Sequence, residues 1–237
     1  MERLDKILAN TGRWSRKEAA ELIKAGRVTV DGLPALRRED KYPETAQFRV
    51  DGEAVSGERL VYLMLNKPAG LVSATDDLRE KTVLSLLPEH LRRVGLFPAG
   101  RLDKDTVGLL LLTNDGELSH ALLSPARHVD KTYLVRVDGV LDEADEDAFR
   151  EGMELRDGLH CLPAELERRG PGEALVTLRE GKYHQVKRMC AARGKPVTFL
   201  KRQSFGPLTL DEGLAPGQWR PLTEEEEAAL RRAAGRV

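Results

Sequence analysis

Two aspartates within residues 98–116, PAGRLDKDTVGLLLLTNDG, best fit a catalytic role in this chain. Asp103 and Asp105 lie next to the cations Arg101 and Lys104 and shortly before an apolar run at 109–112. A carboxylate that a buried strand holds in a loop, with cations within reach, stays ionised and can act as a nucleophile or a general base. The spacing alone fits equally well an aspartate that only caps the loop.

The element after this loop is predicted to be a strand buried on both faces. The run at 109–112 contains only leucine, and it is bounded by Gly108 and by the turn signal Asn114-Asp115-Gly116. Such a strand would hold the loop before it in a fixed position, and the two aspartates with it.

The same segment closely resembles the catalytic motif of the RNA pseudouridine synthases, in the branch that modifies ribosomal RNA. The match runs from GRLD through TVGLLLLTNDG, and the catalytic Asp of the family motif corresponds to Asp103. The resemblance implies isomerisation of uridine, in which the N1–C1′ bond breaks, the uracil turns while held, and C5 bonds to C1′. One carboxylate attacks C1′ or removes a sugar proton, and the sequence leaves both alternatives open. No metal or other cofactor is implied.

Two further residues complete the catalytic site that the resemblance implies. The segment GKYHQVKRMCAARG is similar to a family motif whose basic residue pairs with the catalytic Asp. Lys187 is the closest position, with its neighbour Arg188 as the alternative, and many family members carry Arg where this chain has Lys187. Tyr133, in KTYLV, corresponds to a family tyrosine that packs against the target base. Without the resemblance, Tyr133 would be an ordinary core tyrosine.

Further residues are expected to contact the RNA around an extruded base. Extrusion costs a few kcal/mol and leaves a gap in the stack, and Arg101 resembles the family arginine that fills it. Lys67, in LNKPAG, is expected to be structural or to face phosphate. The remaining candidates for lining the pocket or for contacting sugar and phosphate are Arg127, His128, His184, Gln185 and Arg188.

Residues 1–58 are predicted to form a small RNA-binding module. Helices are expected at 3–10 and 15–25, with Ser15 and Glu18 as a capping box, and strands at 27–32 and 48–52. RLDKILANTGRWSRKEAAELIKAGRVTVDG strongly resembles the S4 RNA-binding domain. Basic side chains of this module would form one phosphate-facing edge, the alternative being a solvated helix face. They are Arg3, Arg13, Arg16, Lys17, Lys24 and Arg27.

Residues 59–237 are predicted to form the catalytic domain, and the chain as a whole to be α+β. A charged stretch at 56–59 is the expected linker. Strands are expected at 60–70, 109–112, 131–139, 174–181 and twice within 196–210. Helices are expected at 82–92, interrupted by Pro88, and at 116–123, 143–153 and 183–194. Strands with interspersed helices and hairpin-like connections indicate a mixed, largely antiparallel sheet.

Composition narrows the class of protein. Among 237 residues, 41% are hydrophobic and 32% charged, no run of 18 apolar residues occurs, and the N-terminal segment is charged rather than signal-like. We therefore expect a cytoplasmic protein without a membrane partner. The net charge of −1 argues against a uniformly basic nucleic-acid binder, but seven basic and no acidic residues lie within 182–202. Cys161 and Cys190 are far apart and predict neither a disulfide framework nor a metal site.

The predicted function is isomerisation of a uridine in 16S ribosomal RNA by a monomeric enzyme. MLNKPAGLVSATDD, GKYHQVKRM and APGQWRPLTEEE are most similar to the small-subunit branch of the family. The sequence leaves open which uridine is modified and whether the substrate is naked RNA or an assembling small subunit. The alternatives are a synthase acting on 23S ribosomal RNA and a non-catalytic S4-type RNA-binding factor of ribosome assembly.

Overall fold

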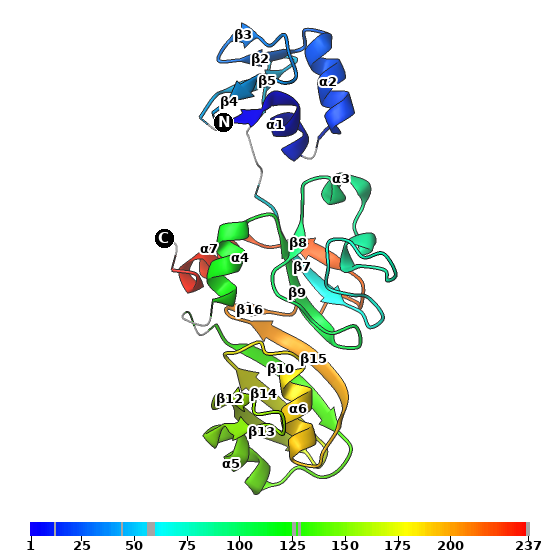
Figure 1. The fold of residues 1–237 in the computed structure, drawn as a ribbon, viewed down its shortest axis with the longest axis vertical. Helices are drawn as coiled ribbons and strands as arrows, with labels where there is room; N and C mark the ends of the chain where they lie inside the picture. Colours follow the sequence, from blue (N-terminus) through cyan, green and yellow to red (C-terminus); the bar gives the residue numbers. More distant parts are fainter. Residues whose placement is uncertain (12, 44, 56–59, 125–126, 128, 236–237) are drawn as a thin grey trace. The chain divides into compact units, whose positions relative to one another are not determined.

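A computed structural model describes the chain except residues 12, 44, 56–59, 125–126, 128 and 236–237 and the side chain of residue 90 (Figure 1). The described chain forms two compact units. The first comprises Met1–Val61 with Leu87–Phe97, and the second comprises Tyr62–Leu86 with Pro98–Val237. The domain boundary predicted after residue 58, and the predicted linker, lie outside the described residues.

In the first unit, two helices pack with short antiparallel strands. Both predicted helices and both predicted strands are confirmed, and the sheet has the order β3-β2-β5-β6, while β1 pairs with β4. The bounds are β1 Glu2–Arg3, α1 Leu4–Asn10, α2 Arg16–Lys24, β2 Val28–Val30, β3 Leu33–Pro34, β4 Lys41–Tyr42, β5 Phe48–Val50, β6 Glu53–Val55 and α3 Glu89–Arg92.

The capping box predicted at the start of α2 is present. The Ser15 hydroxyl accepts from the Glu18 backbone N–H at 3.1 Å, and the Glu18 carboxylate accepts from the Ser15 N–H at 2.6 Å. Such a cap stabilises a helix by about 1 kcal/mol. Leu4, Leu8 and Val28 are completely buried in the core between the helices and the sheet.

The second unit is built on one twisted sheet with the order β13-β14-β10-β15-β9-β7-β17. Its β9–β15 pair is parallel and the other pairs along this path are antiparallel, which confirms the mixed, largely antiparallel prediction. The strand bounds are β7 Tyr62–Lys67, β8 Phe97–Pro98, β9 Val107–Thr113, β10 Lys131–Val137, β11 Met153–Glu154, β12 His160–Cys161, β13 Glu165–Gly170, β14 Glu173–Leu178, β15 Val197–Phe205, β16 Leu208–Thr209 and β17 Trp219–Pro221.

Helices cover this sheet where the sequence predicts them, with one addition near the C-terminal end. They are η1 Val83–Leu86, α4 Gly116–Leu123, α5 Glu143–Glu151, α6 Gln185–Ala192 and α7 Glu224–Ala233. Helix α7 was not predicted, although Thr223 and Glu226 form a capping box at its start. Strands β13 and β17 were missed too. None of the helices in the described part of the chain is long and apolar enough to cross a membrane.

Strand β9 fixes the position of the loop that carries Asp103. All its residues after Val107 are buried, as predicted for a strand covered on both faces. At its start, Gly108 pairs with Arg202 of β15 across the parallel junction. A Cβ at Gly108 would collide with the backbone oxygen of Arg202, and the φ of Gly108 is +99°. Glycine is therefore required where the loop joins the sheet.

Candidate active site

Lys67, the last residue of β7, anchors the loop around Asp103. Its side chain is completely buried, and its ammonium donates hydrogen bonds to the backbone oxygens of Asp103 at 3.0 Å, Lys104 at 3.3 Å and Thr106 at 2.9 Å. A fourth bond, of 3.1 Å, goes to the backbone oxygen of Pro68. Because these carbonyls occupy the ammonium and no part of Lys67 reaches solvent, its role is structural and not phosphate-facing.

Ser73 holds the same loop from the other side. Its hydroxyl donates to the backbone oxygen of Leu102 at 2.9 Å and accepts from the Leu102 N–H at 3.0 Å, and all these groups are buried. Together with Lys67, this reciprocal pair fixes the backbone immediately before and at Asp103. A catalytic group needs such support to stay within tenths of an ångström of a productive position.

The cation that contacts Asp103 comes from helix α6. Lys187 Nζ lies 2.8 Å from Asp103 Oδ2 and 2.6 Å from Asp105 Oδ1. His184 Nε2 lies 3.3 Å from the other oxygen of Asp103. Arg188 instead pairs with Asp157. Of the two alternatives for the partner of Asp103, the structure therefore places Lys187 in contact.

The cations adjacent to the aspartates in the chain form no ion pair with them within the described residues. Lys104 pairs with Glu80 at 2.8 Å, and Arg101 is exposed and makes no ion pair within the described residues. The sequence suggested that these neighbours would serve the carboxylates, whereas the contact comes from a helix distant in the chain. Asp105 shares the ammonium of Lys187 with Asp103.

This arrangement keeps Lys187 charged. Burial lowers the pKa of Lys187, but hydrogen bonds to Asp103 and Asp105 outweigh burial and raise it above its ordinary value. The hydrogen bond from Lys187 likewise lowers the pKa of the Asp105 carboxyl. One ammonium thus faces the side chains of two aspartates, in a site whose Asp103 side chain is 27% exposed.

Asp103 lines a small cavity together with several of the predicted residues. The cavity has a volume of about 70 Å³, and Arg101, Tyr133, His184 and Gln185 also line it. Tyr133 lies in β10 and is 8% exposed, with Val135 buried on the same face of the strand. The geometry thus places a carboxylate, an aromatic ring and an exposed arginine around one opening.

Gln185 supports the loop 180–185 rather than presenting free hydrogen-bonding groups. It is buried, its amide donates to Glu180 at 2.7 Å, and its oxygen accepts from the Lys182 N–H at 3.1 Å. Arg127 is exposed and does not line the cavity. His128 lies outside the described residues. The structure therefore gives no pocket contact for Arg127 and Arg188.

The first unit has a separate basic hollow. Its volume is about 780 Å³, and its basic lining residues are Arg3, Arg16, Lys17, Lys24, Arg37 and Arg38. Arg3 and Arg16 both bind the buried Asp5, at 3.0 and 3.1 Å. Burial raises the pKa of Asp5, but hydrogen bonds from the two arginines outweigh burial and lower it.

Only part of the predicted basic edge of this unit lines the hollow. Arg13 lies 4.0 Å from Glu53, Arg27 pairs with Asp51, and neither lines the hollow. The acidic partners, Glu53 and Asp51, lie in the second half of the module. The positions of the arginines in and near the predicted helices therefore did not reveal these ion pairs. Arg37 and Arg38 were missed, although an adjacent Arg pair in a loop is itself a signal for an anion-binding surface.

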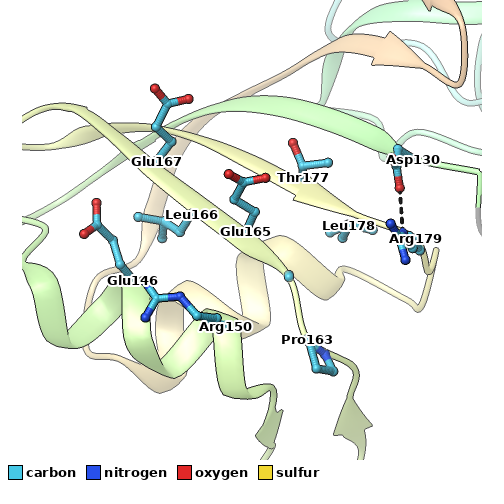
Figure 2. Close-up of a pocket in the computed structure, with 11 residues that line it drawn as sticks. Asp130, Glu146, Arg150, Pro163, Glu165, Leu166, Glu167, Thr177, Leu178 and Arg179 are labelled. Carbon is cyan, nitrogen blue, oxygen red and sulfur yellow. Dashed lines mark hydrogen bonds and ion pairs between the residues drawn. The ribbon is translucent and has the colours of Figure 1, made fainter.

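A larger cavity of the second unit, of about 550 Å³, does not have Asp103 in its lining (Figure 2). Helix α5 and strands β13 and β14 supply most of its walls, and none of the predicted site residues lines it. Among its charged groups, Asp130 binds Arg179 at 2.9 Å. Glu146 binds Arg168, which does not line the cavity, at 2.8 Å. Cavity size therefore does not identify the catalytic site in this protein.

Comparisons with known proteins identify a family for each of two parts of the chain. Residues 61–192 match the family model for RNA pseudouridylate synthase, and residues 2–41 match the S4 domain. An RNA pseudouridine synthase of Bacillus subtilis, itself described as uncharacterized, is 48% identical over 94% of this chain and 96% of its own length. The ribosomal small subunit pseudouridine synthase A of Vibrio cholerae is 43% identical over 96% of this chain and 99% of its own.

A solved structure shares the fold over nearly the whole chain. The crystal structure of a pseudouridylate synthase is 38% identical, covers 97% of this chain and 100% of its own, and superposes with a TM-score of 0.70. The catalytic-domain match, the S4 match and the full-length relatives all lead to the same assignment. The chain is an enzyme of the RNA pseudouridine synthase family that carries an N-terminal S4 domain.

Proposed function

We propose that this enzyme converts a uridine of 16S ribosomal RNA to pseudouridine, with Asp103 as the catalytic residue. The observation that carries the proposal is the Asp103 carboxylate beside the Tyr133 cavity, paired at 2.8 Å with the Lys187 ammonium. An adjacent cation keeps a carboxylate ionised, which both of its possible roles require. These roles are attack on C1′ and removal of a sugar proton.

All the bonds that break and form in the proposed reaction lie within one nucleotide. The N1–C1′ bond breaks, the uracil turns within the site, and C5 bonds to C1′. The proton on C5 then leaves, and N1 of the product carries a proton. Tyr133 is positioned to pack against the base during the turn and to assist removal of the C5 proton, because its ring lines the cavity that contains Asp103.

The base must leave its helix to reach Asp103, and Arg101 is the proposed side chain that fills the gap. Extrusion of a base costs a few kcal/mol, which an inserted side chain partly offsets. Arg101 is exposed and makes no ion pair in the described part of the chain, and it lies two residues from Asp103. His184 contacts Asp103 and would face the sugar or phosphate of the same nucleotide.

The choice of 16S ribosomal RNA rests on the relatives. Proteins of Vibrio cholerae and Escherichia coli that are 43% identical to this chain are named ribosomal small subunit pseudouridine synthase A. The basic hollow of the first unit, with Arg3, Arg16 and Lys17 in its lining, is the proposed phosphate-binding surface. We propose that the enzyme acts as a monomer, and a ribosomal substrate would place the reaction in the cytoplasm.

Mapping of the product tests this proposal. The purified protein is incubated with 16S ribosomal RNA, 23S ribosomal RNA and partly assembled small subunits, and pseudouridine is located by chemical probing. We expect one modified uridine in 16S ribosomal RNA, free or partly assembled. Modification of 23S ribosomal RNA alone would overturn the choice of substrate. RNA binding without product on any of these substrates would favour a non-catalytic assembly factor.

A further inference from the structure

Tyr183 presents an aromatic ring to solvent beside the candidate active site. The residue is 76% exposed, and its ring stacks on the imidazole of His184 with a centroid separation of 3.8 Å and an interplanar angle of 19°. One face of the Tyr183 ring is therefore covered by His184. The exposed fraction shows that much of the remaining ring surface is open.

His184 connects this ring to Asp103. Its Nε2 lies 3.3 Å from Asp103 Oδ1, while its imidazole carries the stacked Tyr183 ring. The backbone of His184 has a φ of +51°, in the left-handed region that non-glycine residues rarely adopt. This turn lies immediately before α6, and His184 lines the cavity that contains Asp103.

The surroundings of the ring fit a nucleotide better than an apolar partner. Arg101 lines the same cavity as His184 and makes no ion pair within the described residues, so its guanidinium is available to contact RNA beside the ring. Single-stranded nucleic acids bind to surfaces that combine exposed aromatic rings with such cations, because every base has a face that stacks.

The ligand of the Tyr183 ring would be a base next to the extruded target base. When a target base leaves the stack, the base next to it loses a stacking partner. If the target nucleotide is held at Asp103, a neighbouring nucleotide lies close to the stacked rings of His184 and Tyr183. An exposed ring at this place can stack on that neighbouring base when it is unpaired, while Arg101 fills the gap left in the helix.

We propose that Tyr183, supported by His184, is a stacking site for an unpaired base adjacent to the target uridine. The inference rests on the proposed function, because it requires a nucleotide held at Asp103. Tyr183 would thereby favour uridines whose neighbour can be unstacked, and so contribute to the choice of substrate region as well as to affinity.

Substitution of Tyr183 gives the first test. With an RNA fragment that contains the mapped uridine, Tyr183→Ala is expected to lower kcat/KM by about 5- to 150-fold, which is the range for loss of one base–aromatic stack. Tyr183→Phe keeps the ring and is expected to regain most of this loss. Val140→Ala, which shortens a side chain that is 64% exposed on another loop of the same unit, is the matched control. Equal kcat/KM for Tyr183→Ala and wild type would overturn the inference.

Abasic RNA gives a second test, which distinguishes base stacking by Tyr183 from a purely structural role of this residue. An abasic nucleotide is placed in turn at each position flanking the target uridine. At one position, the wild-type enzyme should lose about as much kcat/KM as Tyr183→Ala loses on intact RNA. Tyr183→Ala should lose nothing further there, because the stacking pair is already absent. Losses that multiply at every flanking position would contradict a stacking role.

These outcomes are separable from failure of the proposed function. If the wild-type protein modified no uridine in 16S ribosomal RNA, the proposed function would be contradicted. If the wild-type protein were active and the Tyr183→Ala variant equally active, only the proposed stacking site would be contradicted. The ratio of variant to wild type on one RNA therefore tests Tyr183 independently of which uridine is mapped.

Discussion

Lys187 donates to Asp105 as well as to Asp103, although Lys187 and Asp105 are 82 residues apart in the chain. The distance is 2.6 Å to Asp105 and 2.8 Å to Asp103. Asp105 is 73% exposed at its side chain, whereas Asp103 is 27% exposed and lines the cavity. The two carboxylates therefore share one cation but differ in environment, and this difference separates their expected roles.

Substitution of Lys187 should lower the rate much more than substitution of a nearby surface lysine. Lys187→Met removes the cation beside Asp103, and we expect kcat to fall by about 10²- to 10³-fold, as for loss of one electrostatic partner at an active site. Lys187→Arg keeps the charge and should recover part of the rate. Lys104→Met is the control in the same loop, since Lys104 pairs with Glu80. Single-turnover conversion of RNA measures all three, and equal rates for Lys187→Met and Lys104→Met would exclude the pairing from catalysis.

Asp105→Asn should have a small effect. An exposed ion pair contributes about 0.2–1 kcal/mol, so loss of the Asp105–Lys187 contact should change kcat by less than about fivefold. Lys187 keeps its contact with Asp103 in this variant. The same single-turnover assay gives the comparison. A loss of activity as large as that of Asp103→Asn would show that the catalytic assignment of the two aspartates is wrong.

Much of the site could be predicted from local sequence, because motifs place Asp103, Tyr133 and Lys187 on recognisable elements. The loop before β9, the alternating strand β10 and the helix α6 all form where the pattern indicates. Apart from the Asp103–Lys187 pair, which the family resemblance implied, the ion pairs could not be predicted in the same way. Lys104 is adjacent to Asp103 yet binds Glu80, because the direction of each side chain depends on which segments the sheet brings together.

The tertiary hydrogen bonds around the loop illustrate the same limit. The loop 101–106 is anchored by Lys67 and Ser73, which lie in β7 and after it. A lysine in a strand has no sequence signal for burial, since lysine is almost always exposed. Only the order of β7 beside β9 shows that its ammonium meets backbone oxygens rather than phosphate.

Lys67 should make the stability of the second unit depend on pH. Burial lowers the pKa of Lys67 to about 8, whereas the unfolded value is about 10.4. Between these values the unfolded chain binds more protons than the folded chain, so this group makes the free energy of unfolding increase with pH. Lys67→Met should be less stable at every pH, because carbonyls lose their donor, and should lack this increase.

Urea unfolding at pH 7 and pH 10 measures this difference. Trp219 lies in β17 beside β7, and a Trp14→Phe background leaves it as the only tryptophan, so its fluorescence reports the second unit. The comparison is between the pH dependence of this background protein and of its Lys67→Met variant. An identical change with pH in both proteins would show that Lys67 does not titrate as its burial requires.

Variants of Tyr133 should distinguish the contribution of its aromatic ring from that of its hydroxyl group. Tyr133→Phe keeps the buried ring, so we expect RNA affinity close to wild type, and a rate reduced by about 10²- to 10⁴-fold if the hydroxyl assists proton removal. Tyr133→Leu also removes the aromatic face and should weaken productive binding further. Measurement of Kd and single-turnover rate on the same RNA gives both quantities. An unchanged rate for Tyr133→Phe would restrict Tyr133 to packing against the base.

The most direct test of the central claim is pseudouridine formation by wild-type protein and by Asp103→Asn on 16S ribosomal RNA. Asparagine has nearly the shape of aspartate but cannot act as a nucleophile or a base, so the variant should bind RNA with a Kd close to wild type. We expect its rate to fall below about one thousandth of the wild-type rate, as for loss of an essential catalytic group. Pseudouridine formed by Asp103→Asn at a rate close to that of wild type would contradict the account.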